Sequence, residues 1–165
     1  MRLMSTLIVA ALALTACSSK AEDRARTPAA PGAAASPARH PLSGLEIVPL
    51  TVSRTGRTHR FRVEVARTAA EQARGLMFRT ALSDDEGMIF PMNPPRHASF
   101  WMRNTVIPLD IIYIGADGRI TNMWENTVPY SEEPLPSTGI VKGVLELRGG
   151  RAKQLGLMPG DKVVW

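Results

Sequence analysis

From residue 45 to its end, the sequence is divided into short apolar segments at intervals of about ten residues, and turn residues separate them. Residues 61–65 alternate apolar and charged side chains, which is typical of a strand buried on one face. Residues 115–118, Gly-Ala-Asp-Gly, are typical of a hairpin turn. We therefore expect strands over residues 47–52, 61–65, 88–90, 98–103, 109–114, 119–127, 140–147 and 162–165.

Two short helices are expected between these strands. Thr68 and Glu71 have the spacing of a capping box, and residues 69–77 continue it as a short helix. Residues 149–155 are the second candidate helix. No segment has the spacing of a βαβ unit, so the sequence predicts a mainly β fold: a single antiparallel β-sandwich or barrel-like domain over residues 45–165, with one or two short helices.

The first 17 residues resemble a bacterial lipoprotein leader. Arg2 supplies a positive start, residues 7–14 are apolar and uncharged, and Leu14-Thr15-Ala16-Cys17 has the form of a lipoprotein cleavage box. The apolar run is too short for a permanent membrane-spanning helix. We therefore expect residues 1–16 to be removed as a signal peptide and Cys17 to be acylated, which makes the membrane one partner of the protein. Because Cys17 is the only cysteine, no disulfide can form within the chain.

Residues 17–44 are dominated by Ala and Pro and contain little that a core could bury. Such a composition predicts an extended tether between the acylated cysteine and the β domain. Ser18 rather than Asp follows Cys17, which by analogy with enterobacterial sorting favours the outer membrane. The expected location is therefore the cell envelope, with the protein anchored by lipid to the outer membrane and facing the periplasm.

The net charge of +5 does not indicate nucleic-acid binding, because the excess lies outside the predicted domain core. Residues 61–165 hold 12 basic and 12 acidic side chains, whereas residues 17–60 hold seven basic and three acidic ones. A DNA-binding domain concentrates Lys and Arg on its folded surface. The sequence therefore predicts no nucleic-acid partner.

Six short motifs resemble a known family. They are Arg74-Gly75-Leu76-Met77, Gly87-Met88-Ile89-Phe90, Phe100-Trp101-Met102-Arg103-Asn104-Thr105, Pro108-Leu109-Asp110, Val144-Leu145-Glu146-Leu147 and Pro159-Gly160-Asp161. Their order over residues 61–165 is similar to that of the family called domain of unknown function 192. The resemblance implies a small, mainly β domain that is often exported, and it implies no activity and no catalytic residue.

The candidate binding surface comprises Trp101, Arg103, Asn104 and Asp110, because aromatic and polar groups cluster there beside a Pro-rich loop. Asp110 is a single carboxylate among apolar neighbours at the start of a strand, so it needs partners. Arg103 or the Asn104 amide could supply them.

Two further carboxylates, Glu146 and Asp161, are candidates for polar support of this region or, together with Asp110, for acid and base catalysis. The sequence has no serine nucleophile elbow, no phosphate loop and no zinc-ligand spacing, so the leading hypothesis is a non-catalytic binding or accessory domain without cofactor or metal. One alternative is an enzyme that acts on envelope polysaccharide through these carboxylates. Another is a periplasmic copper-binding protein that uses His97 with Met88, Met92 and Met102.

Overall fold

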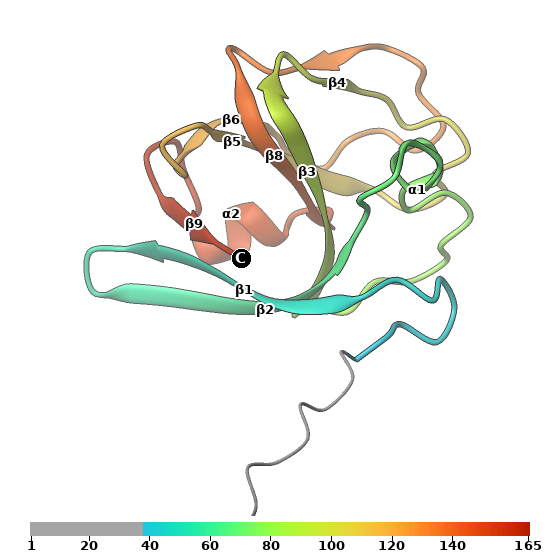
Figure 1. The fold of residues 1–165 in the computed structure, drawn as a ribbon, viewed down its shortest axis with the longest axis horizontal. Helices are drawn as coiled ribbons and strands as arrows, with labels where there is room; N and C mark the ends of the chain where they lie inside the picture. Colours follow the sequence, from blue (N-terminus) through green and yellow to red (C-terminus); the bar gives the residue numbers. More distant parts are fainter. Residues whose placement is uncertain (1–37) are drawn as a thin grey trace, which may run out of the picture. The chain divides into compact units, whose positions relative to one another are not determined.

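Seven strands form one sheet in the computed structural model, which describes residues 38–165 (Figure 1). The order across the sheet is β6 (Ile120–Trp124), β5 (Leu109–Gly115), β8 (Val141–Arg148), β3 (Glu86–Arg96), β2 (Arg57–Val65), β1 (Ile47–Arg54) and β9 (Lys162–Val164). A two-stranded sheet pairs β4 (Ser99–Phe100) with β7 (Leu135–Pro136). The helices are α1 (Ala69–Arg74) and α2 (Arg151–Leu155). The predicted leader and acylated Cys17 lie outside the described residues.

The mainly β fold and the two short helices predicted from the sequence are confirmed. All neighbouring strands are antiparallel except β2 and β3, which are parallel and are connected through α1. The sheet is therefore mixed, and the expectation that no segment forms a βαβ unit is wrong. The Arg119 to Lys162 bridge brings the beginning of β6 near β9, but the sheet does not close into a barrel. Within the described residues, no helix has the length and apolar character needed to cross a membrane.

The central strands are buried on both faces of the sheet. On one face, Val63, Ile112 and Leu145 belong to a core that α2 also joins through Ala152. On the other face, Phe90, Tyr113 and Val144 belong to a second core, which the segment after α1 joins through Leu76. Strand alternation therefore decides which of two separate interiors receives each side chain of β5 and β8.

Several expected boundaries are wrong. β2 begins at Arg57 rather than at residue 61, β6 ends at Trp124 rather than at residue 127, and α1 ends at Arg74 rather than at residue 77. Residues 88–90 were expected to end a strand at Pro91, yet β3 continues to Arg96, because Pro91 lies at a register irregularity opposite Gly143 where a missing N–H is tolerated. Residues 98–103 were expected as a strand, yet β4 covers Ser99–Phe100 alone. The chain turns after β4, since Met102 is fully buried and its N–H donates to the Ser131 carbonyl.

The start of α1 agrees with the sequence pattern. The Thr68 side chain accepts from the Glu71 N–H at 3.2 Å, and the Glu71 carboxylate accepts from the Thr68 N–H at 2.8 Å. This capping box fixes the helix that carries one wall of the site described next.

Candidate functional site

A pocket of about 320 Å³ lies between the α1 region, β3 and β4. Its walls are mixed, and five apolar side chains form part of them: Leu76 and Met77 come from the segment after α1, Phe90 and Met92 from β3, and Phe100 from β4. The volume is at the small end of the range of about 300–1,000 Å³ found for ligand pockets. It suits a small molecule.

Aromatic rings fix one wall of the pocket. The Phe90 and Phe100 rings pack edge to face with centroids 4.9 Å apart, and Phe100 packs in the same manner on Tyr113 at 6.3 Å. The Tyr113 hydroxyl donates a hydrogen bond to the Leu135 carbonyl, which ties β5 to β7. Since β7 pairs with β4, this contact helps to hold Phe100 in place.

Glu146 contributes a carboxyl group to this pocket. It lies on β8 opposite Met88 on one side and Ile111 on the other, both of which belong to the core on this face. The residue is 5 % exposed, and its Oε2 atom has no hydrogen-bond partner among the described residues. Burial raises the pKa of Glu146 to about 8, so the carboxyl group is mostly neutral at pH 7 and has a proton to donate.

The lining of the pocket also includes three basic side chains, Arg74, Arg96 and His97. All three are exposed. Neither arginine makes an ion pair with a carboxylate in the described part of the chain, and Arg96 has one long hydrogen bond, 3.4 Å, to the Gln72 side chain. The exposed basic groups can therefore bind an anion at the mouth of the pocket. At its inner end, the neutral Glu146 carboxyl group can donate a hydrogen bond to an acceptor.

Three of the four residues of the candidate binding surface lie near this pocket. Trp101 is 47 % exposed and lines the pocket, and the Arg103 guanidinium lies over its ring at 5.4 Å. Arg103 also lies 3.8 Å from the Glu132 carboxylate. Asn104 has a φ of 55°, and its carbonyl accepts from the Phe78 N–H at 2.9 Å. Trp101 and Arg103 are thus the exposed part of the surface, while Asn104 shapes the turn.

Asp110 does not belong to that surface. It is 0 % exposed, and its carboxylate accepts hydrogen bonds from three backbone N–H groups: Asn126 at 2.7 Å, Gly150 at 2.9 Å and Ala152 at 2.6 Å. The expectation that Arg103 or Asn104 would be its partner is wrong, because Asp110 is paired with Leu147 and faces the start of α2. Its visible role is to hold α2 and the segment after β6 against the sheet.

The three carboxylates considered for catalysis do not converge. Asp110 and Glu146 lie on opposite faces of the sheet. Asp161 is buried elsewhere, where it accepts from the Met158 N–H at 3.0 Å and lies 3.8 Å from Arg54 Nε. The arrangement therefore gives no support to an enzyme that uses these carboxylates together.

The residues considered for copper are divided between core and pocket. Met88 and Met102 are buried in the core, and the Met102 sulfur accepts a hydrogen bond from the Thr127 hydroxyl at 3.1 Å. Met92 and His97 line the pocket. Over residues 38–165, no group of three or more His, Cys, Asp and Glu side chains could hold a metal ion.

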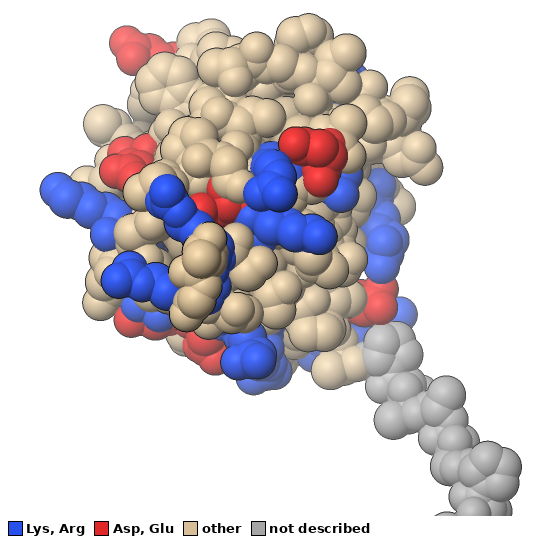
Figure 2. All heavy atoms as spheres, turned by 90° about the vertical axis from the view of Figure 1, so that its left-hand side faces the viewer, with Lys and Arg blue, Asp and Glu red and all other residues tan. Residues whose placement is uncertain are grey.

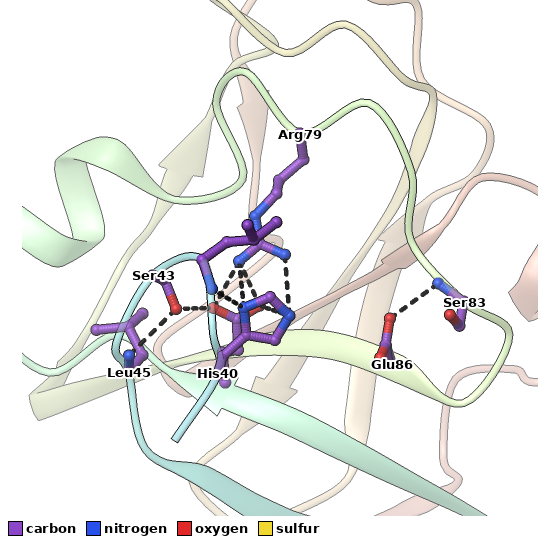
Figure 3. Close-up of polar contacts among 8 residues, drawn as sticks. His40, Ser43, Leu45, Arg79, Ser83 and Glu86 are labelled. Atoms are coloured by element: carbon purple, nitrogen blue, oxygen red, sulfur yellow. Dashed lines mark hydrogen bonds and ion pairs between the residues drawn. The ribbon is translucent and has the colours of Figure 1, made fainter.

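A buried charge cluster surrounds Glu64 on β2, and Figure 3 labels three of its members, His40, Ser43 and Arg79. Arg79 Nη2 donates to both oxygens of the Glu64 carboxylate, at 2.6 and 2.7 Å, and the Ser43 hydroxyl donates to one of them. His40 Nε2 lies 3.8 Å from Glu64 Oε1. All the partners of this carboxylate come from the protein, so the cluster holds the segment around residues 40–45 on the domain.

Glu146 was not expected from the sequence to lie at the centre of the candidate site. It was a candidate for polar support, although Val144-Leu145-Glu146-Leu147 contains the signal that singled out Asp110: one carboxylate among apolar residues of a strand. Arg74 and Arg96 were not candidates, because nothing in the sequence indicates that they meet at one pocket.

Comparisons with known proteins agree with this fold. The model of the family DUF192, described as "Uncharacterized ACR", matches residues 50–165. The crystal structure of a protein of unknown function from Novosphingobium aromaticivorans DSM 12444 has 63 % sequence identity and a TM-score of 0.77, covering 80 % of this chain and 94 % of that chain. A protein from Sinorhizobium meliloti 1021, described as a "putative transcription regulator", has 38 % identity and a TM-score of 0.71, covering 73 % and 94 %. No curated protein matches the chain.

Proposed function

Because this chain belongs to the DUF192 family, whose description gives no activity, its function has to be inferred from its site, and we propose that it is a ligand-binding protein of the cell envelope. Its binding site is the pocket between α1, β3 and β4, and its ligand is a small organic anion with an apolar body. The observation that carries this proposal is the buried Glu146 carboxyl group, which has no partner for Oε2.

A buried polar group without a hydrogen bond lowers the stability of the folded protein by roughly 1–3 kcal/mol, as judged from the effects of mutations in proteins. In Glu64 and Asp110 the protein supplies partners for a buried carboxylate. At Glu146 it supplies none for Oε2, and the group instead lines a pocket. A ligand that carries a hydrogen-bond acceptor at its inner end would satisfy the neutral carboxyl group and recover that cost.

The rest of the lining defines the other two features of the ligand. Phe90 and Phe100 favour a flat apolar body such as an aromatic ring. Arg74 and Arg96 favour an anionic group such as a carboxylate at the outer end, since a guanidinium binds a carboxylate through two parallel hydrogen bonds. An inner acceptor, a ring and an outer anion together describe a substituted aromatic acid.

The envelope location rests on the sequence. Cys17 as an acylated anchor and residues 18–37 as a tether would keep the binding domain beside a membrane, with the pocket open to the periplasm. The expected tether is shorter at its end, because residues 39–44 pack on the domain. A role in transcription regulation, which the description of the Sinorhizobium protein gives for that protein, is not what we propose here. The charge balance of residues 61–165 does not favour it.

The test is a thermal-shift titration of the full chain in detergent with three matched probes. The probe 4-acetylbenzoate has all three ligand features, 4-acetylbenzamide lacks the charge, and 4-ethylbenzoate lacks the inner acceptor. We expect 4-acetylbenzoate to raise the melting temperature in a concentration-dependent manner. Each of the other two probes should bind at least about fivefold more weakly, because each leaves one protein group unpaired.

Two variants locate the binding. Glu146→Leu should abolish the preference for the acetyl group, and Arg74→Gln with Arg96→Gln should abolish the preference for the carboxylate. Equal responses of wild type and both variants would show that the probes bind elsewhere and would overturn the proposal, as would no response to any aromatic acid. Stabilisation by Cu(I) alone would favour a soft metal site at Met92 and His97 instead.

A further inference from the structure

The side of the molecule formed by the hairpin ends and β9 carries a cluster of cations (Figure 2). Lys162 is exposed on β9 and pairs with Ser53, which is next to Arg54 on β1. Its backbone also forms an isolated β-bridge with the backbone of Arg119. The Lys142 side chain lies beside Gly118 in the β5–β6 turn, since a Cβ atom added at Gly118 would be 3.0 Å from its Nζ atom. We call Arg54, Arg57, Arg119, Lys142 and Lys162 the basic face.

The acidic side chains of this region do not cancel its charge. Asp161 is buried, and it accepts from the Met158 N–H and lies 3.8 Å from Arg54. Asp117 is exposed, and its Oδ1 accepts from the Arg119 N–H at 3.0 Å. Five cations against these two anions and the terminal carboxylate of Trp165 leave the basic face with a net positive charge.

Apolar groups lie among these cations. Val164 points outward from β9 with 52 % exposure, and Met158 is exposed nearby in the loop before β9. The Lys142 ammonium lies 5.1 Å above the ring of the C-terminal Trp165, which is partly exposed. Basic side chains around exposed aliphatic groups and a tryptophan are the composition that rests at a membrane interface.

We propose that the basic face docks on an anionic phospholipid surface, with its Lys and Arg side chains on the headgroup phosphates and with Val164 and Trp165 at headgroup depth. Charge complementarity carries this inference. The length of the tether is compatible with docking. Twenty residues separate Cys17 from residue 38 and can span at most about 70 Å, so an acylated Cys17 would keep the domain within that distance of the membrane. An acyl anchor together with a basic surface supplies two independent membrane signals.

Docking in this manner leaves the ligand pocket accessible. In Figure 1, β9 and the hairpin ends lie on the left, whereas α1 lies on the right. The α1 side provides the exposed Arg74 of the pocket lining. The basic face and the proposed ligand site can therefore act independently, and failure of one proposal leaves the other standing.

The test is co-sedimentation with lipid vesicles of the chain from residue 17 onward, in which Cys17→Ser removes the acylation site. One set of vesicles contains 70 % phosphatidylcholine and 30 % phosphatidylglycerol, and the other contains phosphatidylcholine alone. We expect binding to the anionic vesicles that weakens as salt is raised. In the Lys142→Gln and Lys162→Gln double variant, the partition coefficient should fall about 25-fold, since each cation near the surface contributes about fivefold.

The matched control removes two cations from the other side through Arg74→Gln and Arg103→Gln, so that the loss of net charge is the same. It should bind the vesicles within about twofold of the parent protein. Equal weakening of both double variants would show a dependence on net charge alone and would overturn the docking face. Vesicle binding that neither variant changes would assign the interaction to the basic residues of the tether and would also overturn it.

Discussion

Asp110 and Glu146 lie on the neighbouring strands β5 and β8, and their carboxyl groups are on opposite faces of the sheet. Each is a single acidic residue among apolar strand neighbours. Asp110 receives three backbone hydrogen bonds, whereas the Oε2 atom of Glu146 receives none. This difference separates a carboxylate whose hydrogen bonds hold the fold together from one whose Oε2 atom has no partner among the described residues.

The first prediction concerns the pH dependence of stability. The pKa of Glu146 rises from an ordinary value of 4.5 to about 8 because the side chain is buried. Between these values the folded protein binds one more proton than the unfolded chain does. The contribution of Glu146 to the free energy of unfolding is therefore fully present below about pH 4.5. It decreases as the pH rises and is lost above about pH 8, with a limiting slope of about 1.4 kcal/mol per pH unit.

Glu146→Gln keeps the shape of the side chain and removes the titration. Urea unfolding of both proteins at each pH from 5 to 9 isolates the contribution of this group, because all other titrating groups are shared. We expect the variant to gain stability relative to wild type as the pH rises. A difference between the two proteins that stays constant with pH would contradict the assignment.

The second prediction concerns Asp110. Asp110→Ala removes the acceptor of three backbone N–H groups and leaves them buried, so we expect a loss of at least about 3 kcal/mol in the free energy of unfolding. The exposed Asp85 serves as the control, and Asp85→Ala should change stability by no more than about 0.5 kcal/mol. Urea denaturation midpoints measure both. Equal small effects would mean that the three hydrogen bonds contribute little.

The third prediction concerns the capping box of α1. Thr68→Ala removes the acceptor of the Glu71 N–H and should lower the free energy of unfolding by about 1 kcal/mol. Thr80, which is exposed, gives the matched control. If Thr80→Ala is as destabilising as Thr68→Ala in thermal unfolding, the cap is not the cause.

Much of the fold was visible in the sequence. Alternation over residues 61–65, the hairpin residues 115–118 and the Thr68 cap each reflect local chemistry, and each has its counterpart in β2, the β5–β6 turn and α1. The parallel pairing of β2 with β3 was not visible, because a period of two residues says which face a side chain takes but not which strand lies beside it.

The site was harder to predict than the fold for the same reason. Every residue of β5 is buried, so the sequence could not show that Asp110 and Glu146 enter different interiors. Their separation follows from the register that pairs Asp110 with Leu147 and Ile111 with Glu146. Arg74 and Arg96 contribute to one pocket because the α1 region and β3 meet there, a tertiary contact that no local pattern encodes.

The last prediction concerns the Glu64 cluster. Arg79→Met leaves a buried carboxylate without the Nη2 group that donates to both of its oxygens, so we expect a loss of about 3–5 kcal/mol in the free energy of unfolding. The double variant Glu64→Met, Arg79→Met replaces the buried pair by apolar side chains and should be more stable than the Arg79→Met protein. A double-mutant cycle by urea unfolding gives the coupling energy of the pair.

The exposed ion pair of Arg148 with Asp84, whose Nη2 and Oδ1 atoms are 2.7 Å apart, provides the comparison. Arg148→Met should cost no more than about 1 kcal/mol, because water screens an exposed pair. A similar cost for Arg79→Met and Arg148→Met would show that the burial of Glu64 does not strengthen its dependence on Arg79. A much larger cost for Arg79→Met, recovered in the double variant, would establish that burial of the charge determines the penalty.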